Sequence, residues 1–259
     1  MAEEITEETA EEVEEQKNPY WGAWPTVGLG CALMAIAIFA SAVIAMVFLA
    51  SSLHGNTLAD IKKVLEGFTT NGLYFSVTGI AEAIVCTGLI IVFINMLHTI
   101  SFRDYLGLRA FSIKQTLVVL GITLGILLLS DGTSLLLGKP AVGEWQLALY
   151  QSSVWPALLW IAFVIFGPVF EEVLFRGFLF EGFRHSSMGV IGAVLVTALL
   201  WSLGHIQYNF YGIAQIFIFG VVLGYIRYKT GSLWSVIAMH SLFNLVGMAE
   251  TALQVSSKI

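Results

Sequence analysis

The chain has 259 residues, of which 57% are hydrophobic and only 12% carry a charged side chain. Soluble domains carry about 25% charged residues, so this composition excludes an ordinary soluble protein and predicts a polytopic membrane protein. The net charge of −6 belongs to the first 18 residues, which hold eight glutamates and one lysine, whereas residues 19–259 hold ten acidic and eleven basic residues. The lipid bilayer is therefore an expected partner, and nucleic acid is not.

The acidic segment 1–18 has neither the basic start nor the apolar middle of a signal peptide. Its composition predicts a solvated, disordered tail. The remaining chain divides into an N-terminal transmembrane region at 19–153 with three spans, a second transmembrane domain at 154–250, and a C-terminal tail at 251–259.

Seven apolar stretches are long enough to cross the membrane, since a helix needs about 20 residues to span about 30 Å of hydrocarbon. They cover about residues 27–50, 73–98, 115–137, 154–181, 189–205, 210–228 and 232–250. Residues 138–153 are too short and polar to span, and Trp145 and Tyr150 there suit a short interfacial helix. The predicted fold class is an all-α polytopic transmembrane bundle with about seven spans.

Short links join the last four stretches, for example at 184–188 and 206–209. Helices joined by short links are antiparallel neighbours, so we expect these four to pack together around a polar active-site cavity. Two G-x-x-x-G patterns, at 121–125 and 220–224, place small residues on one helix face and permit close helix approach.

The membrane orientation follows from the positive charges of the short loops, which concentrate on the cytoplasmic side. With the N-terminus inside, seven basic residues lie in the cytoplasm and four outside. The inner set is Lys17, Arg103, Arg109, Lys114, Arg184, Arg227 and Lys229, and the outer set is Lys62, Lys63, Lys139 and Lys258. We therefore expect an integral, multi-pass membrane protein with a cytoplasmic N-terminus; if the source is a prokaryote, the membrane is the cytoplasmic one.

The fourth stretch contains Glu171, Glu172 and Arg176 in a run that is otherwise apolar. An ionisable residue within a membrane is costly and indicates a functional site. Glu172 and Arg176 are four residues apart, so they share a helix face and are expected to pair. Such a pair alone could serve packing only, but Glu171 points about 100° away and is left without an obvious partner.

Three further polar residues interrupt the later stretches: His205, four residues after Trp201, and the pair His240 and Asn244. A single histidine in an apolar run is usually a core residue. Two histidines on separate helices of a bundle that also holds Glu171 favour a site instead.

This set of residue types allows two kinds of chemistry. Glu171 could accept a proton from water held by His205, while His240 and Asn244 donate hydrogen bonds to an oxyanion. Alternatively, Glu171, His205 and His240 could be three ligands of a zinc ion with a fourth position open for water. No His-Glu-x-x-His pattern is present. Glu172 is assigned to Arg176, so few carboxylates remain to orient metal-bound histidines, and we expect no tightly bound zinc.

The three motifs, Glu171-Glu172-x-x-x-Arg176, Trp201-x-x-x-His205 and His240-x-x-x-Asn244, resemble those of the CAAX prenyl protease and bacteriocin-processing family, also called Abi proteins. The resemblance covers about residues 154–249 and departs in one respect, because the family's second motif usually starts with Phe. Residues 154–250 are thus identified as a CPBP/Abi-like protease domain.

The resemblance implies an intramembrane endopeptidase of the type II CAAX protease kind, acting on a membrane-associated protein or peptide. In this family Glu171 and His205 would activate water, His240 and Asn244 would form the oxyanion hole, and Glu172 with Arg176 would orient the site. Both a metalloprotease and a glutamate-dependent mechanism without metal have been described for the family.

Two other classes of function remain open from the sequence. A non-catalytic immunity or scaffold protein could keep the same residues as a structural polar network. A proton-coupled transporter could use buried carboxylates and histidines as a relay, although the seven stretches show no evident inverted repeat.

Overall fold

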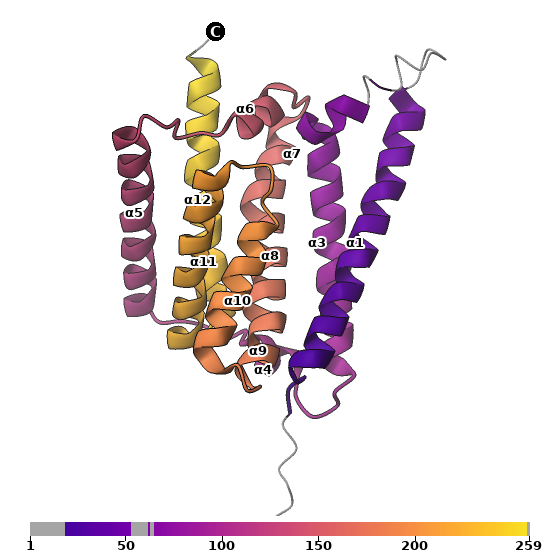
Figure 1. Cartoon of the computed structure of the whole chain (residues 1–259), viewed down its shortest axis with the longest axis vertical. Coiled ribbons are helices and arrows are strands. Elements are labelled where there is room, and N and C mark those ends of the chain that lie inside the picture. The colour runs from indigo at the N-terminus through magenta and orange to yellow at the C-terminus, as the bar shows by residue number, and fades with distance from the viewer. Residues whose placement is uncertain (1–18, 53–61, 63–64, 258–259) are drawn as a thin grey trace, which may run out of the picture.

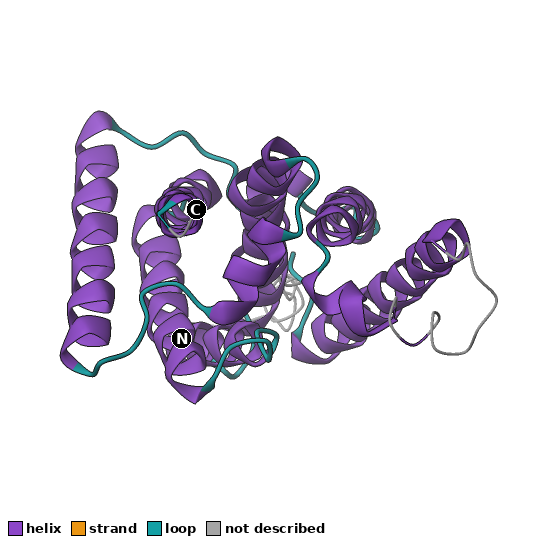
Figure 2. Ribbon diagram, turned by 90° about the horizontal axis from the view of Figure 1, so that it is seen from above, coloured by secondary structure: helices purple, strands orange, loops and turns teal. Residues whose placement is uncertain are grey.

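A computed structural model describes residues 19–52, 62 and 65–257, and within these ranges it contains helices and loops but no strand (Figures 1 and 2). The prediction of an all-α transmembrane bundle is therefore confirmed. The predicted acidic tail, residues 1–18, lies outside the described residues.

Among the residues that the structure describes, six helices are long and apolar enough to cross a membrane. Five are single elements: α1 (Ala23–Ser52), α3 (Gly72–Asn95), α5 (Ile113–Leu136), α11 (Phe210–Thr230) and α12 (Leu233–Ser256). The sixth is a 29-residue composite, Pro156–Arg184, made of α7 (Pro156–Ile161), η3 (Ala162–Phe166), α8 (Gly167–Glu172), η4 (Val173–Leu179) and α9 (Phe180–Arg184).

The seventh predicted span is α10 (Gly189–Leu203), which is apolar but has only 15 residues. The shorter elements are the 3-10 helix η2 (Phe68–Thr70), α4 (Phe102–Leu106) and α6 (Glu144–Gln151). Helix α6 lies within the segment 138–153 where a short helix was predicted. Helix α12 continues to Ser256, so residues 251–256 are helical and do not form the predicted tail.

The helices run alternately up and down, and α1 begins at the end of the molecule opposite to the one where α12 finishes (Figure 1). The composite helix packs against α3, α10, α11 and α12, which confirms that the last four predicted stretches form one bundle. Helix α1 covers α3 at one edge, and α5 stands at the other edge beside α11 and α12 (Figure 2).

The two G-x-x-x-G patterns have different surroundings. A Cβ added at Gly220 would lie 3.1 Å from Ala198, Arg176 and Trp201 side-chain atoms, and one at Gly224 would lie 3.2 Å from Val194. Residues 220–224 therefore allow the close approach of α11 to α10. Nothing lies within 4 Å of such an atom at positions 121 and 125, so this second pattern does not bring another described helix close to α5.

Candidate active site

Two π-helical stretches, η3 and η4, flank the turn of α-helix that carries the paired glutamates. Pro168 in this turn has no N–H, so the carbonyl of Phe163, its partner in an i to i−5 pattern, needs another donor. Asn244 of α12 supplies it, with Nδ2 2.8 Å from the Phe163 oxygen. One N–H of Asn244 is therefore engaged with the backbone beside the site. π-Helical turns occur frequently at functional sites.

Glu172 is the buried member of the glutamate pair and is fully inaccessible, as is Arg176. Arg176 Nη1 donates to Glu172 Oε1 at 2.9 Å, which confirms the predicted pairing. His240 Nδ1 lies 2.8 Å from the same oxygen, and Arg176 Nη2 donates to the Gly220 carbonyl at 3.1 Å. Glu172 thus holds both a guanidinium and an imidazole in place.

Glu171 is the accessible member of the pair, with 26% of its side chain exposed. Its Oε2 accepts a hydrogen bond of 2.5 Å from the indole N–H of Trp201 and lies 3.9 Å from His240 Nε2. His240 therefore lies between the two carboxylates, with one ring nitrogen toward each. Because Nδ1 faces a carboxylate oxygen, this nitrogen carries a proton.

Trp201 is the residue whose role the sequence reasoning missed. Besides its bond to Glu171, its ring lies under the Arg176 guanidinium at 4.4 Å, and the rings of His205 and His240 each lie 5.2 Å from it. A buried indole N–H normally finds an acceptor, and this signal could have linked Trp201 to a carboxylate of the neighbouring helix.

The sequence analysis predicted that His205 ends the span 189–205. In the structure α10 ends at Leu203, and His205 lies in the loop that follows. Its Nδ1 is 2.8 Å from the Trp201 carbonyl, which assigns the proton to Nδ1 and leaves Nε2 as an acceptor. No hydrogen bond or ion pair connects His205 to Glu171 in the described part of the chain. The structure thus joins Glu171, Glu172, Arg176 and His240 directly, and His205 only through Trp201.

Tyr208 follows in the same loop and stacks on His205 with ring centroids 6.3 Å apart. Burial, with a smaller contribution from the negative charge of Glu171, raises the pKa of Tyr208 to about 12. The phenol is therefore neutral at physiological pH and can act as a hydrogen-bond donor.

A second ionic cluster lies at the end of the composite helix. Glu181 Oε1 is 2.7 Å from Arg227 Nη2, and its Oε2 is 2.7 Å from Arg184 Nε. Arg227 also donates to the carbonyl of Arg176 at 3.1 Å, so this cluster braces the helix that carries the active-site charges.

The sequence analysis counted Arg227 among the loop charges. The structure corrects this point, because Arg227 lies within α11 and is only 3% exposed. The position of Arg227 near the end of an apolar run was the signal that it needed a buried partner.

The predicted alternative of a zinc site can be tested against these positions. Among the described residues, no group of three His, Cys, Asp or Glu side chains is placed to hold a metal ion. Glu171, His205 and His240 therefore do not fit the proposed ligand set. The prediction of no tightly bound zinc assumed that Glu172 pairs with Arg176 alone. This assumption was wrong, because Glu172 Oε1 contacts His240 as well as Arg176.

The fold and the buried polar cluster define an integral membrane protein with a candidate intramembrane active site. Residues 153–246 match the family model described as type II CAAX prenyl endopeptidase Rce1-like. No curated protein and no solved structure matches the chain. The matched region contains every residue of the cluster described above, from Glu171 to Asn244, and is similar to this family.

Proposed function

We propose that the protein is an intramembrane endopeptidase in which Glu171 activates a water molecule for hydrolysis of a peptide bond. The observation that carries this proposal is the difference between the two glutamates: Glu172 is fully buried and paired, whereas Glu171 is 26% exposed and has no cation within hydrogen-bond distance among the described residues. A positioned, accessible carboxylate is the group that general-base catalysis requires.

In the proposed reaction, Glu171 accepts a proton from water while the water oxygen attacks the carbonyl carbon of the scissile bond. Glu171 then returns the proton to the leaving nitrogen as the C–N bond breaks. His205 assists by accepting a hydrogen bond from the same water at Nε2. His240 donates to the oxyanion from Nε2 in its imidazolium form, and the second N–H of Asn244 donates beside it.

Access of water is supported by the length of α10. Its 15 residues extend about 22 Å at 1.5 Å per residue, less than the roughly 30 Å of hydrocarbon. The following loop, 204–209, then begins at membrane depth. Irregular backbone at this depth is tolerated where it is buried in protein or lines a water-filled space. His205 and Tyr208 both lie in this loop, so water that reaches the loop also reaches His205.

Trp201, Glu172 and Arg176 are positioning residues in this mechanism. The indole N–H fixes one oxygen of Glu171, and Glu172 fixes the ring of His240. Arg176 balances Glu172 and supports the Trp201 ring. Such a supporting set holds the reactive groups in one geometry, which is what efficient catalysis needs.

The substrate class that we propose is a membrane-associated protein or peptide, and a prenylated C-terminal cysteine peptide is the first candidate from the family description. The test is hydrolysis of a farnesylated peptide of this kind by the purified protein, followed by mass spectrometry. In parallel, membrane proteomes of cells with wild-type or Glu171→Gln protein are compared for an uncleaved substrate.

Glu171→Gln should reduce turnover by about 10² to 10⁴-fold, the usual contribution of a general base, while the protein remains folded. Glu250→Gln is the matched control, because it neutralises a glutamate of α12 for which the described residues show no hydrogen bond or ion pair with Glu171, Glu172, Arg176 or His240. Unchanged cleavage in the Glu171 variant would refute the mechanism. Normal cell function without any cleavage would favour the scaffold alternative.

A further inference from the structure

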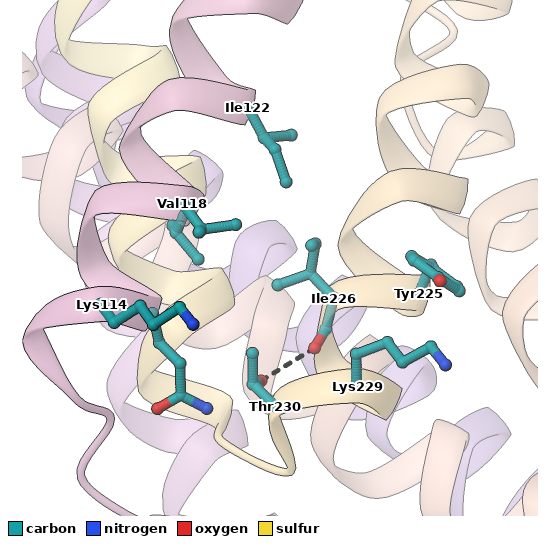
Figure 3. A pocket seen from close by; sticks show the side chains of 9 residues that line it. Lys114, Val118, Ile122, Tyr225, Ile226, Lys229 and Thr230 are labelled. Carbon is teal, nitrogen blue, oxygen red and sulfur yellow. Dashed lines mark hydrogen bonds between the residues drawn. The ribbon is translucent and has the colours of Figure 1, made fainter.

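A groove separates α5 from α11 near the end of the molecule where α5 begins and α11 finishes (Figure 3). Its volume is about 340 Å³. The apolar side chains of Val118, Val119 and Ile122 line it from α5, and Ile226 lines it from α11. Val118 is 52% exposed, so the groove is open at the surface of the bundle.

Two lysines line this groove, one on each helix; the ammonium of Lys114 points toward the groove, whereas the side chain of Lys229 extends away from α5, toward Tyr225 (Figure 3). Lys114 lies in the first turn of α5, and Lys229 lies in the last turn of α11 (Figure 3). In the described part of the chain, neither has a carboxylate within ion-pair distance. The ammonium of Lys229 instead lies 5.6 Å from the ring centre of Tyr225 and 5.7 Å from that of Tyr228, and tyrosines are typical of the membrane interface.

The groove exists because α5 is fastened to α11 at its other end only. There Gln215 donates to Ser130 at 3.0 Å, and the Tyr211 hydroxyl lies 3.0 Å from Thr133 and 3.1 Å from Ser134. Toward the lysine end no such polar contact joins the two helices among the described residues. The result is an apolar slot with one lysine on each of its two helices at one membrane face.

We propose that this groove binds an anionic membrane phospholipid, with an acyl chain between α5 and α11 and the negatively charged headgroup at Lys114 and Lys229. Basic pockets between transmembrane helices are suited to anionic headgroups, and each lysine near the surface contributes about 1 kcal/mol to the attraction. The N-terminus of α5 adds a partial positive charge at the same place.

The apolar lining of the groove and the positive charge of its lysines favour an anionic lipid over a zwitterionic lipid or a segment of the chain itself. A zwitterionic lipid would fill the slot but leave the net charge of the lysines unbalanced, and the glutamate-rich segment 1–18 offers few apolar side chains to fill it. The groove lies at the end of the bundle where the described chain begins (Figure 1). With a cytoplasmic N-terminus, this is the leaflet richer in anionic lipid.

The test uses the full-length protein purified in a neutral detergent. Binding of phosphatidylglycerol and of phosphatidylcholine with identical acyl chains is measured by native mass spectrometry and by the shift in melting temperature. The wild type should bind phosphatidylglycerol about tenfold more tightly, and Lys114→Gln/Lys229→Gln should remove this preference. Both lysines are exposed, so their replacement leaves the helix packing intact.

Two further variants make the result specific to the groove. Arg103→Gln/Arg109→Gln removes the same charge from exposed positions in and after α4 that do not line the groove, and it should keep the preference. Val118→Trp fills the slot and should weaken binding of both lipids. Equal affinity for the two lipids in the wild type would overturn the proposal, as would an equal loss in the arginine control or unchanged binding in Val118→Trp.

Discussion

The composite helix Pro156–Arg184 carries two buried ionic clusters, and their charge balance differs. In the cluster around Glu181, one carboxylate is bonded to two guanidinium groups, those of Arg184 and Arg227. In the cluster around Glu172, there are two adjacent carboxylates but one guanidinium, that of Arg176, and it is paired with Glu172. The first cluster has an excess of permanent positive charge, and the second an excess of negative charge.

This difference is the basis for proposing a structural role for the first cluster and a chemical role for the second. Every oxygen of Glu181 has a cationic partner, so the carboxylate is fully used in joining α9 to α11. In the other cluster, Glu172 takes the cation, and Glu171 keeps an accessible carboxylate that is held only by the neutral indole of Trp201. Burial and charge are common to both clusters, so the proposed catalytic role of Glu171 rests on its unbalanced and accessible charge.

Of the substitutions that test this comparison, Glu172→Gln is expected to have the largest effect. Glu172→Gln removes the charge that balances Arg176 and holds His240, and breaking a buried pair costs about 3–5 kcal/mol. We expect both a strongly lowered melting temperature and loss of cleavage. Thermal unfolding in detergent and peptide hydrolysis measure the two effects. A stable and fully active variant would show that Glu172 does not organise the site.

A smaller effect is expected at Trp201. Trp201→Phe keeps an aromatic ring beside Arg176 but removes the N–H that bonds Glu171, and a hydrogen bond to a charged group contributes about 1.5–3 kcal/mol. Turnover should fall by about tenfold to hundredfold, with KM unchanged. Trp234→Phe, at a 45% exposed position of α12, is the control and should have no effect. A change in KM alone would argue against a role in positioning Glu171.

The smallest effect is expected from metal removal, because the described donors do not form a metal-binding group. We expect EDTA to change activity by less than about twofold, and zinc to be substoichiometric in the purified protein. Inhibition by excess zinc is compatible with this, since carboxylates and imidazoles bind zinc readily. One zinc per chain, with activity lost on chelation and restored on re-addition, would contradict the expectation.

The positions of the long helices, and side-chain contacts within a single helix, could be predicted from the sequence. Apolar run lengths located the six long spans, and a spacing of four residues predicted the pair of Glu172 and Arg176, because both follow from the geometry of a single helix. The length of α10 was overestimated, since the apolar composition continues past Leu203 although the helix ends there.

Contacts between helices could not be derived in the same way. The bond from Trp201 to Glu171 depends on how α8 and α10 are rotated toward each other, and the pairing of Glu181 with Arg227 spans 46 residues. The hydrogen bond from Asn244 to the Phe163 carbonyl depends on a π-helical turn, which the hydrophobic pattern does not predict. Pro168, inside an apolar run, was the one local residue that indicated an irregular turn there.

The most direct measurement compares Glu171→Gln with Arg227→Met in one assay of cleavage per folded molecule and melting temperature. We expect opposite results for the two variants. Glu171→Gln should lose cleavage by at least about 10²-fold at an unchanged melting temperature. Arg227→Met should lower the melting temperature, because it leaves a buried charge with one partner fewer, and should keep cleavage within about tenfold. Retained cleavage in Glu171→Gln, or an equal loss of cleavage in both variants, would contradict the central claim that Glu171 is the catalytic base.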